Sequence, residues 1–222
     1  MIMKCVAIIP AAGIGTRFGG TLPKQFSEYE SIPILIHTLK LFERIDEVSS
    51  VIVAITPSWE DYTNEMIGVH GLNKVNKIIA GGKERQDSVF NTLNTIQPNE
   101  YDIVIIHDAV RPFASSELVR KIIRTAHEFG AVIPALKPKE TIKQIDENGM
   151  VQKTLDRSVL CAVQTPQGFK TGIIISAYKK AMEVHYYATD DAALVEYAGY
   201  PVKVIDGEES NIKITTQLDI QF

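Results

Sequence analysis

Short apolar runs alternate along the chain with longer segments in which apolar residues recur at helical spacing. The apolar runs predict buried strands at residues 5–9, 51–55, 77–80, 103–106, 131–136 and 202–205. The segments between them predict helices at residues 32–41, 59–67, 84–93, 116–129, 171–184 and 189–199. Alternating strands and helices are typical of α/β proteins. We therefore predict a Rossmann-like, mostly parallel sheet flanked by helices.

Residues 137–157 depart from this pattern, because polar and apolar positions alternate there with period two around a D-E-N-G turn. This alternation predicts a β-hairpin inserted into a single domain that spans residues 1–222. Its strands are too polar for the main core, so we expect a projecting arm, which would gain stability by packing on a second subunit. A solvated charged hairpin and a role in substrate binding both fit its basic residues.

Composition narrows the class of protein. The chain has 222 residues, 45% of them hydrophobic, with a formal net charge of −4. No basic face is indicated, which argues against a nucleic-acid or membrane-surface partner. Both cysteines, Cys5 and Cys161, lie in apolar settings that predict buried reduced thiols. Because no apolar run approaches the ~18 residues of a membrane span, we expect a cytoplasmic protein.

The first predicted strand leads into a glycine-rich connection at residues 10–25, which reads P-A-A-G-I-G-T-R-F-G-G-T-L-P-K-Q. Glycines let the backbone approach a ligand closely, so N–H groups can face phosphate oxygens. Arg17 and Lys24 add positive charge beside them. The spacing matches neither the P-loop nor the dinucleotide-binding fingerprint. The connection has the composition of a polyphosphate-binding loop, although a surface loop with incidental charges also fits.

A second glycine turn, G-G-K-E-R-Q-D-S-V, follows the predicted strand at 77–80. Two such turns after two parallel strands would place free backbone N–H groups on one edge of the sheet, which favours a nucleotide pocket. Arg85 and Ser88 are about one helical turn apart and would share a face with that pocket. They are also acceptable as ordinary polar helix residues.

The strand at 103–106 ends in H-D-A-V-R-P-F. An aspartate at the carboxyl end of a buried strand stands where nucleotide enzymes bind divalent cations, so Asp108 is the best candidate metal ligand. Arg111 would bind a second anionic group, or form a structural salt bridge with Asp108. For His107 we favour a structural hydrogen bond over acid–base chemistry.

Two later motifs carry further polar candidates. In T-D-D-A-A, Asp190 and Asp191 fit helix capping as well as they fit catalysis. In N-I-K, Asn211 and Lys213 lie two residues apart and would share one face of an extended segment. That pair would suit phosphate or metal-bound water.

Taken together and in order, these blocks resemble the 2-C-methyl-D-erythritol 4-phosphate cytidylyltransferase family. The matching blocks include P-A-A-G-I-G-T-R-F-G-G-T-L-P-K-Q-F, G-G-K-E-R-Q-D-S-V, H-D-A-V-R-P-F, E-T-I-K, Q-T-P-Q-G-F, T-D-D-A-A and N-I-K-I-T. The resemblance implies transfer of CMP from CTP to a polyol phosphate in non-mevalonate isoprenoid biosynthesis, with release of pyrophosphate. It also implies a Mg²⁺ requirement and a homodimer in which the hairpin completes the partner's active site.

The resemblance also assigns roles to individual residues. The catalytic cations are Arg17, Lys24 and Lys213, and the metal-side carboxylate is Asp108. The nucleotide-binding residues are Ala11, Ala12, Gly13, Gly15, Gly82, Arg85 and Ser88. The substrate-binding residues are Arg111, Thr141, Arg157, Thr165 and Asp190.

Two other functions remain as alternatives. Ribitol-5-phosphate cytidylyltransferases share the glycine loop, H-D-x-V-R-P and N-I-K, but P-A-A-G, E-T-I-K and Q-T-P-Q-G-F are closer to the methylerythritol family. A non-catalytic nucleotide-binding regulator would keep the glycines and lose the charges. Here the charged positions Arg17, Lys24, Asp108 and Lys213 are all present, which favours an enzyme.

Overall fold

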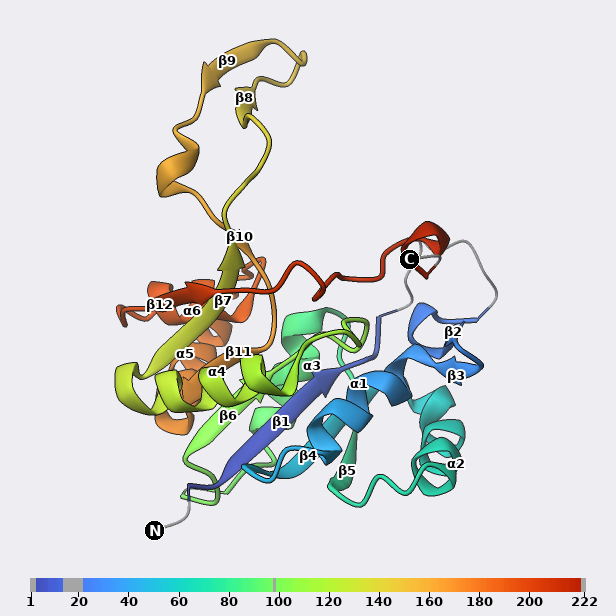
Figure 1. The fold of residues 1–222 in the computed structure, drawn as a ribbon. Helices are drawn as coiled ribbons and strands as arrows, with labels where there is room; N and C mark the ends of the chain where they lie inside the picture. Colours follow the sequence, from blue (N-terminus) through green and yellow to red (C-terminus); the bar gives the residue numbers. More distant parts are fainter. Residues whose placement is uncertain (1–2, 14–21, 98, 221–222) are drawn as a thin grey trace.

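A twisted central sheet organises the molecule (Figure 1). The computed structural model describes residues 3–13, 22–97 and 99–220. Within these residues the sheet has eight strands, in the order β10-β7-β11-β6-β1-β4-β5, with β12 also paired to β7. The strands are β1 (Cys5–Pro10), β4 (Val48–Ile55), β5 (Val75–Ala80), β6 (Ile103–Ile106), β7 (Ala131–Leu136), β10 (Ala162–Val163), β11 (Gln167–Lys170) and β12 (Lys203–Asp206). A short two-stranded sheet pairs β2 (Glu28–Tyr29) with β3 (Ile32–Pro33).

The strand directions confirm the predicted α/β class and correct one detail. Strands β6, β1, β4 and β5 run parallel, and β12 is parallel to β7. The sequence analysis assigned no strand to residues 167–170, yet β11 inserts between β6 and β7 and is antiparallel to both. It is only four residues long and contains Gly168, too short a segment to show a periodic pattern.

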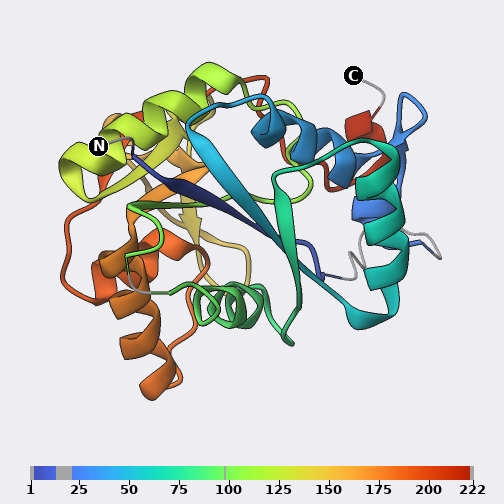
Figure 2. The ribbon, with the colours of Figure 1, turned by 90° about the horizontal axis from the view of Figure 1, so that it is seen from below.

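Helices cover both faces of the sheet (Figure 2). Helices α1 and α4 pack on one face, and α3, α5 and α6 pack on the other. The bounds are α1 (Ile34–Glu43), α2 (Glu60–Val69), α3 (Arg85–Leu93), α4 (Ser116–Phe129), α5 (Thr171–Glu183) and α6 (Asp191–Tyr197). Single turns of 3-10 helix are η2 (Lys24–Phe26), η3 (Pro57–Trp59), η4 (Arg157–Val159) and η5 (Gln217–Ile220). Each predicted helix is present with small shifts at its ends.

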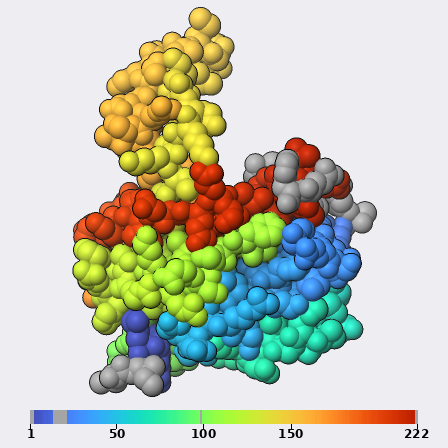
Figure 3. Space-filling view, in the orientation of Figure 1, coloured from blue at the N-terminus to red at the C-terminus, as the bar shows by residue number. Residues whose placement is uncertain are grey.

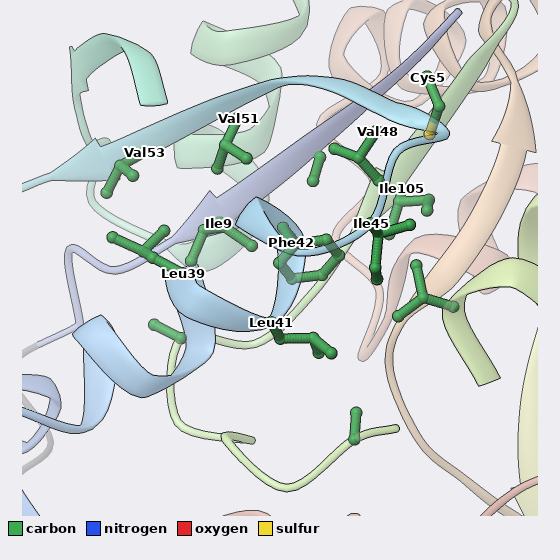
Figure 4. Packing of buried hydrophobic residues seen from close by; sticks show 14 of the residues in the cluster. Cys5, Ile9, Leu39, Leu41, Phe42, Ile45, Val48, Val51, Val53 and Ile105 are labelled. Carbon is green, nitrogen blue, oxygen red and sulfur yellow. The ribbon is translucent and has the colours of Figure 1, made fainter. Parts of the chain in front are cut away.

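The core beneath α1 shows why these segments become helix and strand (Figure 4). Leu39 and Phe42 of α1 point onto the sheet, where they meet Ile9 of β1, Val53 of β4 and Ile105 of β6. Each of these side chains is fully buried. Central strands buried on both faces need continuous β-branched runs rather than alternation, which is the pattern that predicted them.

The segment predicted to form a hairpin contains β8 (Lys143–Ile145) and β9 (Val151–Thr154), paired antiparallel. All residues of both strands are exposed. The hairpin extends away from the body beyond β7 and β10 (Figures 1 and 3). Its contact with a second subunit stays a prediction.

The two cysteines differ in environment. Cys5 is buried in β1, and burial raises the pKa of its thiol far above the usual range. The predicted burial of Cys161 is wrong, since this residue is exposed. It lies between η4 and β10, where the chain returns from the hairpin. In the part of the chain that the structure describes, no helix is both long and apolar enough to cross a bilayer.

Candidate active site

A cavity of about 170 Å³ opens at the carboxyl ends of the parallel strands. Strand β1 has β4 on one side and β6 on the other, so the chain reverses its direction of winding there, and ligands of open α/β sheets bind at such switch points. Segments after β1, β5 and β6 form the walls. The lining residues are Pro10, Ala11, Ala12, Gly13, Lys24, Gln25, Gly82, Lys83, Glu84, Arg85, Ser88, Asp108, Ala109, Val110 and Lys213.

Most of the residues predicted to bind the nucleotide or to catalyse its transfer therefore surround one space. Ala11, Ala12, Gly13, Gly82, Arg85 and Ser88 line it together with Lys24, Asp108 and Lys213. Arg17 and Gly15 lie outside the described residues. Gln25 and Phe26, which follow Lys24 in η2, help to position it, and the sequence analysis did not single them out.

Two contacts fix the segment that carries Lys24. The Gln25 side chain is buried, and its Nε2 donates a hydrogen bond to the Ala11 carbonyl. Phe26 is 2% exposed and stacks on Trp59, with ring centroids 4.8 Å apart. Because the two residues that follow Lys24 are held by these contacts, the backbone of Lys24 is fixed beside the cavity and its charge can be placed there.

The second wall is a tight turn at Gly81 and Gly82. A Cβ on Gly81 would lie 2.2 Å from the Ala12 Cβ, and one on Gly82 would lie 2.2 Å from the Asp87 Cβ. Both positions therefore require glycine because of close approach. The expectation that this turn presents free N–H groups is wrong for these two residues, since Gly81 N–H donates to the Ile55 carbonyl and Gly82 N–H to Ser88 Oγ.

Ser88 thus holds the turn in shape while it lines the cavity. Its hydroxyl also donates to the Glu84 carbonyl at 3.1 Å. Glu84 and Asp87 form a reciprocal capping box at the start of α3, which fixes the first turn of the helix and hence Arg85.

Asp108 is the centre of charge in the site. Its Oδ1 accepts a hydrogen bond from Arg85 Nε at 3.1 Å, and its Oδ2 pairs with Lys213 Nζ at 2.9 Å. Arg111 Nε is 3.5 Å from Oδ2. The Asp108–Arg111 salt bridge that the sequence suggested is therefore present, together with those to Arg85 and Lys213. Burial alone would raise the pKa of Asp108, but Arg85, Lys213 and Arg111 outweigh it and hold the pKa well below its usual range.

His107 and Thr165 form a hydrogen-bonded chain that ends on the Asp108 backbone. The His107 ring is fully buried, with Nε2 2.9 Å from the Arg111 carbonyl and Nδ1 3.0 Å from Thr165 Oγ1. Thr165 Oγ1 also accepts the Asp108 N–H at 3.0 Å. A carbonyl can only accept, so Nε2 carries the proton and Thr165 donates to Nδ1. Burial lowers the pKa of His107 to about 4, which agrees with the structural role preferred for it.

Arg111 and Asn211 join the late N-I-K segment to this support. Arg111 Nη1 donates to the Asn211 carbonyl at 2.7 Å, and Asn211 Nδ2 donates to the Thr165 carbonyl at 2.8 Å. Asn211 is fully buried, whereas the Lys213 side chain is 42% exposed and reaches Asp108. Residues 207–216 form no regular strand, yet both side chains reach the pair formed by Asp108 and Thr165.

The two aspartates at the start of α6, Asp190 and Asp191, have different partners. Asp190 caps the helix by accepting the Ala193 N–H at 3.0 Å, and it also accepts from Gln167 Nε2 at 2.8 Å. Asp191 is fully buried and binds Arg85 through both carboxylate oxygens. The sequence analysis left Asp191 out of the site, although one cap needs only one of the two acids in T-D-D.

The predicted substrate contacts of the hairpin lie elsewhere. Thr141 and Arg157 are exposed, and Arg157 Nη1 donates to the Lys139 carbonyl. Neither residue lines the cavity around Asp108. The single chain therefore does not bring these two residues to the other candidates.

The donor set around the cavity fits a cation that shares its ligands with a substrate. Among the described residues, no group of three or more His, Cys, Asp or Glu side chains is placed to hold a metal. Mg²⁺ is commonly held by one or two carboxylates together with substrate phosphates. Asp108 supplies one carboxylate for that mode, and a cation there would share its oxygens with the side chains of Arg85 and Lys213.

Comparisons with known proteins identify the family of this chain. A sequence profile described as IspD, 2-C-methyl-D-erythritol 4-phosphate cytidylyltransferase, matches residues 5–222. A protein of that name from Alkaliphilus metalliredigens is 44% identical over 218 residues, covering 98% of this chain and 90% of the relative. A Bacillus cereus protein of that name is 41% identical over 213 residues, covering 96% and 93%.

Solved structures give the same result. The 4-diphosphocytidyl-2C-methyl-D-erythritol synthase of Anaerococcus prevotii superposes with a TM-score of 0.86 at 36% identity, covering 99% of this chain and 96% of the other. The 2-C-methyl-D-erythritol 4-phosphate cytidylyltransferase of Thermus thermophilus superposes with a TM-score of 0.80 at 31% identity, with the same coverage. This chain belongs to the 2-C-methyl-D-erythritol 4-phosphate cytidylyltransferase family.

Proposed function

We propose that this protein transfers CMP from CTP to 2-C-methyl-D-erythritol 4-phosphate, giving 4-diphosphocytidyl-2-C-methyl-D-erythritol and pyrophosphate. The observation that carries the proposal is the convergence of two glycine-containing turns, Lys24, Lys213 and the Asp108 cluster on one cavity. Family membership names the two substrates. Both are small charged metabolites, and we accordingly place the enzyme in the cytoplasm.

The reaction is an in-line displacement at the α-phosphorus of CTP. An oxygen of the polyol phosphate forms the new P–O bond, while the bond to the β-phosphate breaks and pyrophosphate leaves. The attacking group is already an anion, so the main requirement is to stabilise charge on the phosphoryl oxygens and on the leaving group. Lys24 and Lys213 line the cavity and supply that positive charge, and we assign the same role to Arg17.

Asp108 is the residue that would hold Mg²⁺, with the triphosphate supplying further oxygen ligands. When bound, the cation neutralises charge on the phosphates during transfer. His107, Thr165 and Arg111 keep the Asp108 carboxylate in place through the bonds described above.

The nucleotide is read by the walls of the cavity. Ala11, Ala12 and Gly13 follow β1, Gly82 belongs to the turn after β5 and Ser88 to α3, and all five line the cavity where we place the base and ribose. Asp190 and Thr165 lie toward the polyol in this assignment.

We also propose that the enzyme is a homodimer in which the hairpin of one subunit completes the site of the other. The support is that Thr141 and Arg157 match substrate-contact positions of the family, yet both are exposed and outside the cavity of their own chain. Because neither residue lines the cavity of its own chain, each would contact a substrate at such a cavity only in another subunit.

The test is pyrophosphate release by the purified protein with CTP and Mg²⁺, run in parallel with methylerythritol 4-phosphate and ribitol 5-phosphate. Release with the first substrate alone is the expected result. Release with ribitol 5-phosphate alone would move the activity to the sister enzyme and keep the mechanism. Silence with both, while CTP still binds, would favour a nucleotide-binding regulator.

A further inference from the structure

Arg85 connects two carboxylates that belong to different parts of the fold. Its Nε donates to Asp108 Oδ1 at 3.1 Å, while Nη1 and Nη2 donate to the two oxygens of Asp191 at 3.0 and 2.8 Å. Asp108 lines the cavity, whereas Asp191 lies outside its lining, at the start of α6. A guanidinium bound by both edges has a fixed plane, because its donors form a rigid fork.

Asp191 is not the N-cap of the helix that contains it. The cap of α6 is made by Asp190. The Asp191 side chain is fully buried, and an ionised carboxylate at that depth is costly unless it is paired and hydrogen-bonded. Two guanidinium donors and a tyrosine hydroxyl, all hydrogen-bonded to Asp191, offset this cost.

That hydroxyl belongs to Tyr178 of α5, which is 1% exposed and donates to Asp191 Oδ1. The Tyr178 ring stacks on Phe90 of α3, with an angle of 6° between the planes. Burial and the neighbouring Asp191 raise the pKa of Tyr178 well above its usual range, so it remains a donor. A continuous chain of contacts thus runs from the packed helices on this face (Figure 2) to the cavity.

Without Asp191, the two Nη groups of Arg85 would be free to turn onto Asp108. That carboxylate already contacts Lys213 and Arg111. Asp191 therefore keeps two of the three guanidinium nitrogens away from Asp108 and offsets the charge of Arg85. The pairing keeps both Arg85 and Asp108 in the lining of the cavity, where Asp108 is 7% exposed.

We propose that Asp191 and Tyr178 are positioning residues that act on nucleotide binding and transfer through Arg85. The inference rests on the proposed function, because the step it affects is cytidylyl transfer. Neither Tyr178 of α5 nor Asp191 of α6 lines the cavity.

The test compares wild-type enzyme with Tyr178→Phe, Asp191→Asn, Arg85→Lys and the double variant Asp191→Asn/Arg85→Lys. Tyr178→Phe keeps the stacked ring and removes only the hydroxyl. Tyr101→Phe is the matched control, because Tyr101 packs at the edge of the same hydrophobic cluster and outside the cavity lining. Steady-state kinetics, CTP affinity by titration calorimetry and thermal melting are measured at a temperature where every variant is folded.

We expect Tyr178→Phe to lower kcat/KM by roughly threefold to tenfold, and Asp191→Asn to lower it on the order of a hundredfold, as misplaced active-site groups do. CTP affinity should fall less in Tyr178→Phe than in Asp191→Asn. Tyr101→Phe should have the kcat/KM and CTP affinity of wild type. In the Arg85→Lys background, which lacks the fork, Asp191→Asn should change kcat/KM less than about threefold, because residues that act as a unit are non-additive.

Wild-type kinetics and CTP affinity in Tyr178→Phe, with only a lower melting temperature, would show a purely structural role and overturn the proposal. So would an equal Asp191→Asn effect with and without Arg85→Lys. If Asp191→Asn does not fold, Tyr178→Phe decides the question. If wild type binds CTP but releases no pyrophosphate, the proposed function fails, and the CTP affinities of the variants still test the positioning.

Discussion

The buried histidine next to Asp108 should make the stability of this protein depend on pH in a defined window. His107 is fully buried and neutral, with Nε2–H donating to the Arg111 carbonyl and Nδ1 accepting from Thr165. Burial lowers its pKa from 6.5 to about 4 in the folded protein. In the unfolded chain the ring titrates near its ordinary value.

The sign follows from where the proton binds. Above pH 6.5 the ring is neutral in both states, and the stabilising contribution is complete. As the pH falls from 6.5 toward about 4, the unfolded chain takes up a proton that the folded protein does not, so stability is lost. At about 1.4 kcal/mol per pH unit and per proton, a pKa difference of about 2.5 corresponds to about 3.5 kcal/mol in total, of which about 3 kcal/mol is lost by pH 4, where the folded His107 is half protonated.

The measurement is urea unfolding at half-unit steps between pH 7 and pH 4, followed by the fluorescence of Trp59, the one tryptophan of the chain. The comparison variant is His107→Gln, whose side chain can donate a hydrogen bond but does not titrate. We expect the free energy of unfolding to fall about 3 kcal/mol more in wild type than in the variant across this window. Other titrating groups contribute similarly to both proteins. Equal pH slopes in the two proteins would refute a buried neutral His107.

Three further changes test the site. Lys24→Ala should lower turnover by orders of magnitude with an unchanged circular dichroism spectrum, as loss of a transition-state cation does; near-normal turnover would remove Lys24 from the mechanism. Gly82→Ala places a Cβ 2.2 Å from that of Asp87, so the turn must shift, and we expect KM for CTP to rise about tenfold or more; an unchanged KM would contradict the close-approach argument. Equal mixing of inactive Lys213→Ala and Arg157→Ala subunits should restore about a quarter of wild-type activity, since half the dimers would then contain one intact site; no recovery after subunit exchange has been verified would contradict a shared site.

Much of the site was predictable because its residues are constrained locally. Glycines where two loops meet, a carboxylate directly after a buried strand and cations beside a glycine-rich loop all leave short sequence signals. These signals placed Gly82, Asp108 and Lys24 correctly on one cavity. The strand at 103–106 was predicted with the bounds that β6 has, because a central strand buried on both faces must be continuously apolar.

Other features depended on partners distant in the sequence. Asp191 binds Arg85 across more than a hundred residues, and no local pattern distinguishes it from the capping Asp190. Gly81 and Gly82 were expected to offer free N–H groups, but Ile55 and Ser88 take them. The exposure of Cys161 depends on where the hairpin leaves the sheet.

The sequence by itself determined the alternation of strands and helices, the two glycine turns and the set of charged residues, because backbone sterics and hydrophobic periodicity act over a few neighbours. Only the tertiary structure decided how the charges are paired. Asp108 could have met Arg111 alone, yet Arg85 and Lys213 also reach it. Such pairings follow from the strand order and from helix packing on both faces of the sheet, which bring residues far apart in the chain within hydrogen-bond distance.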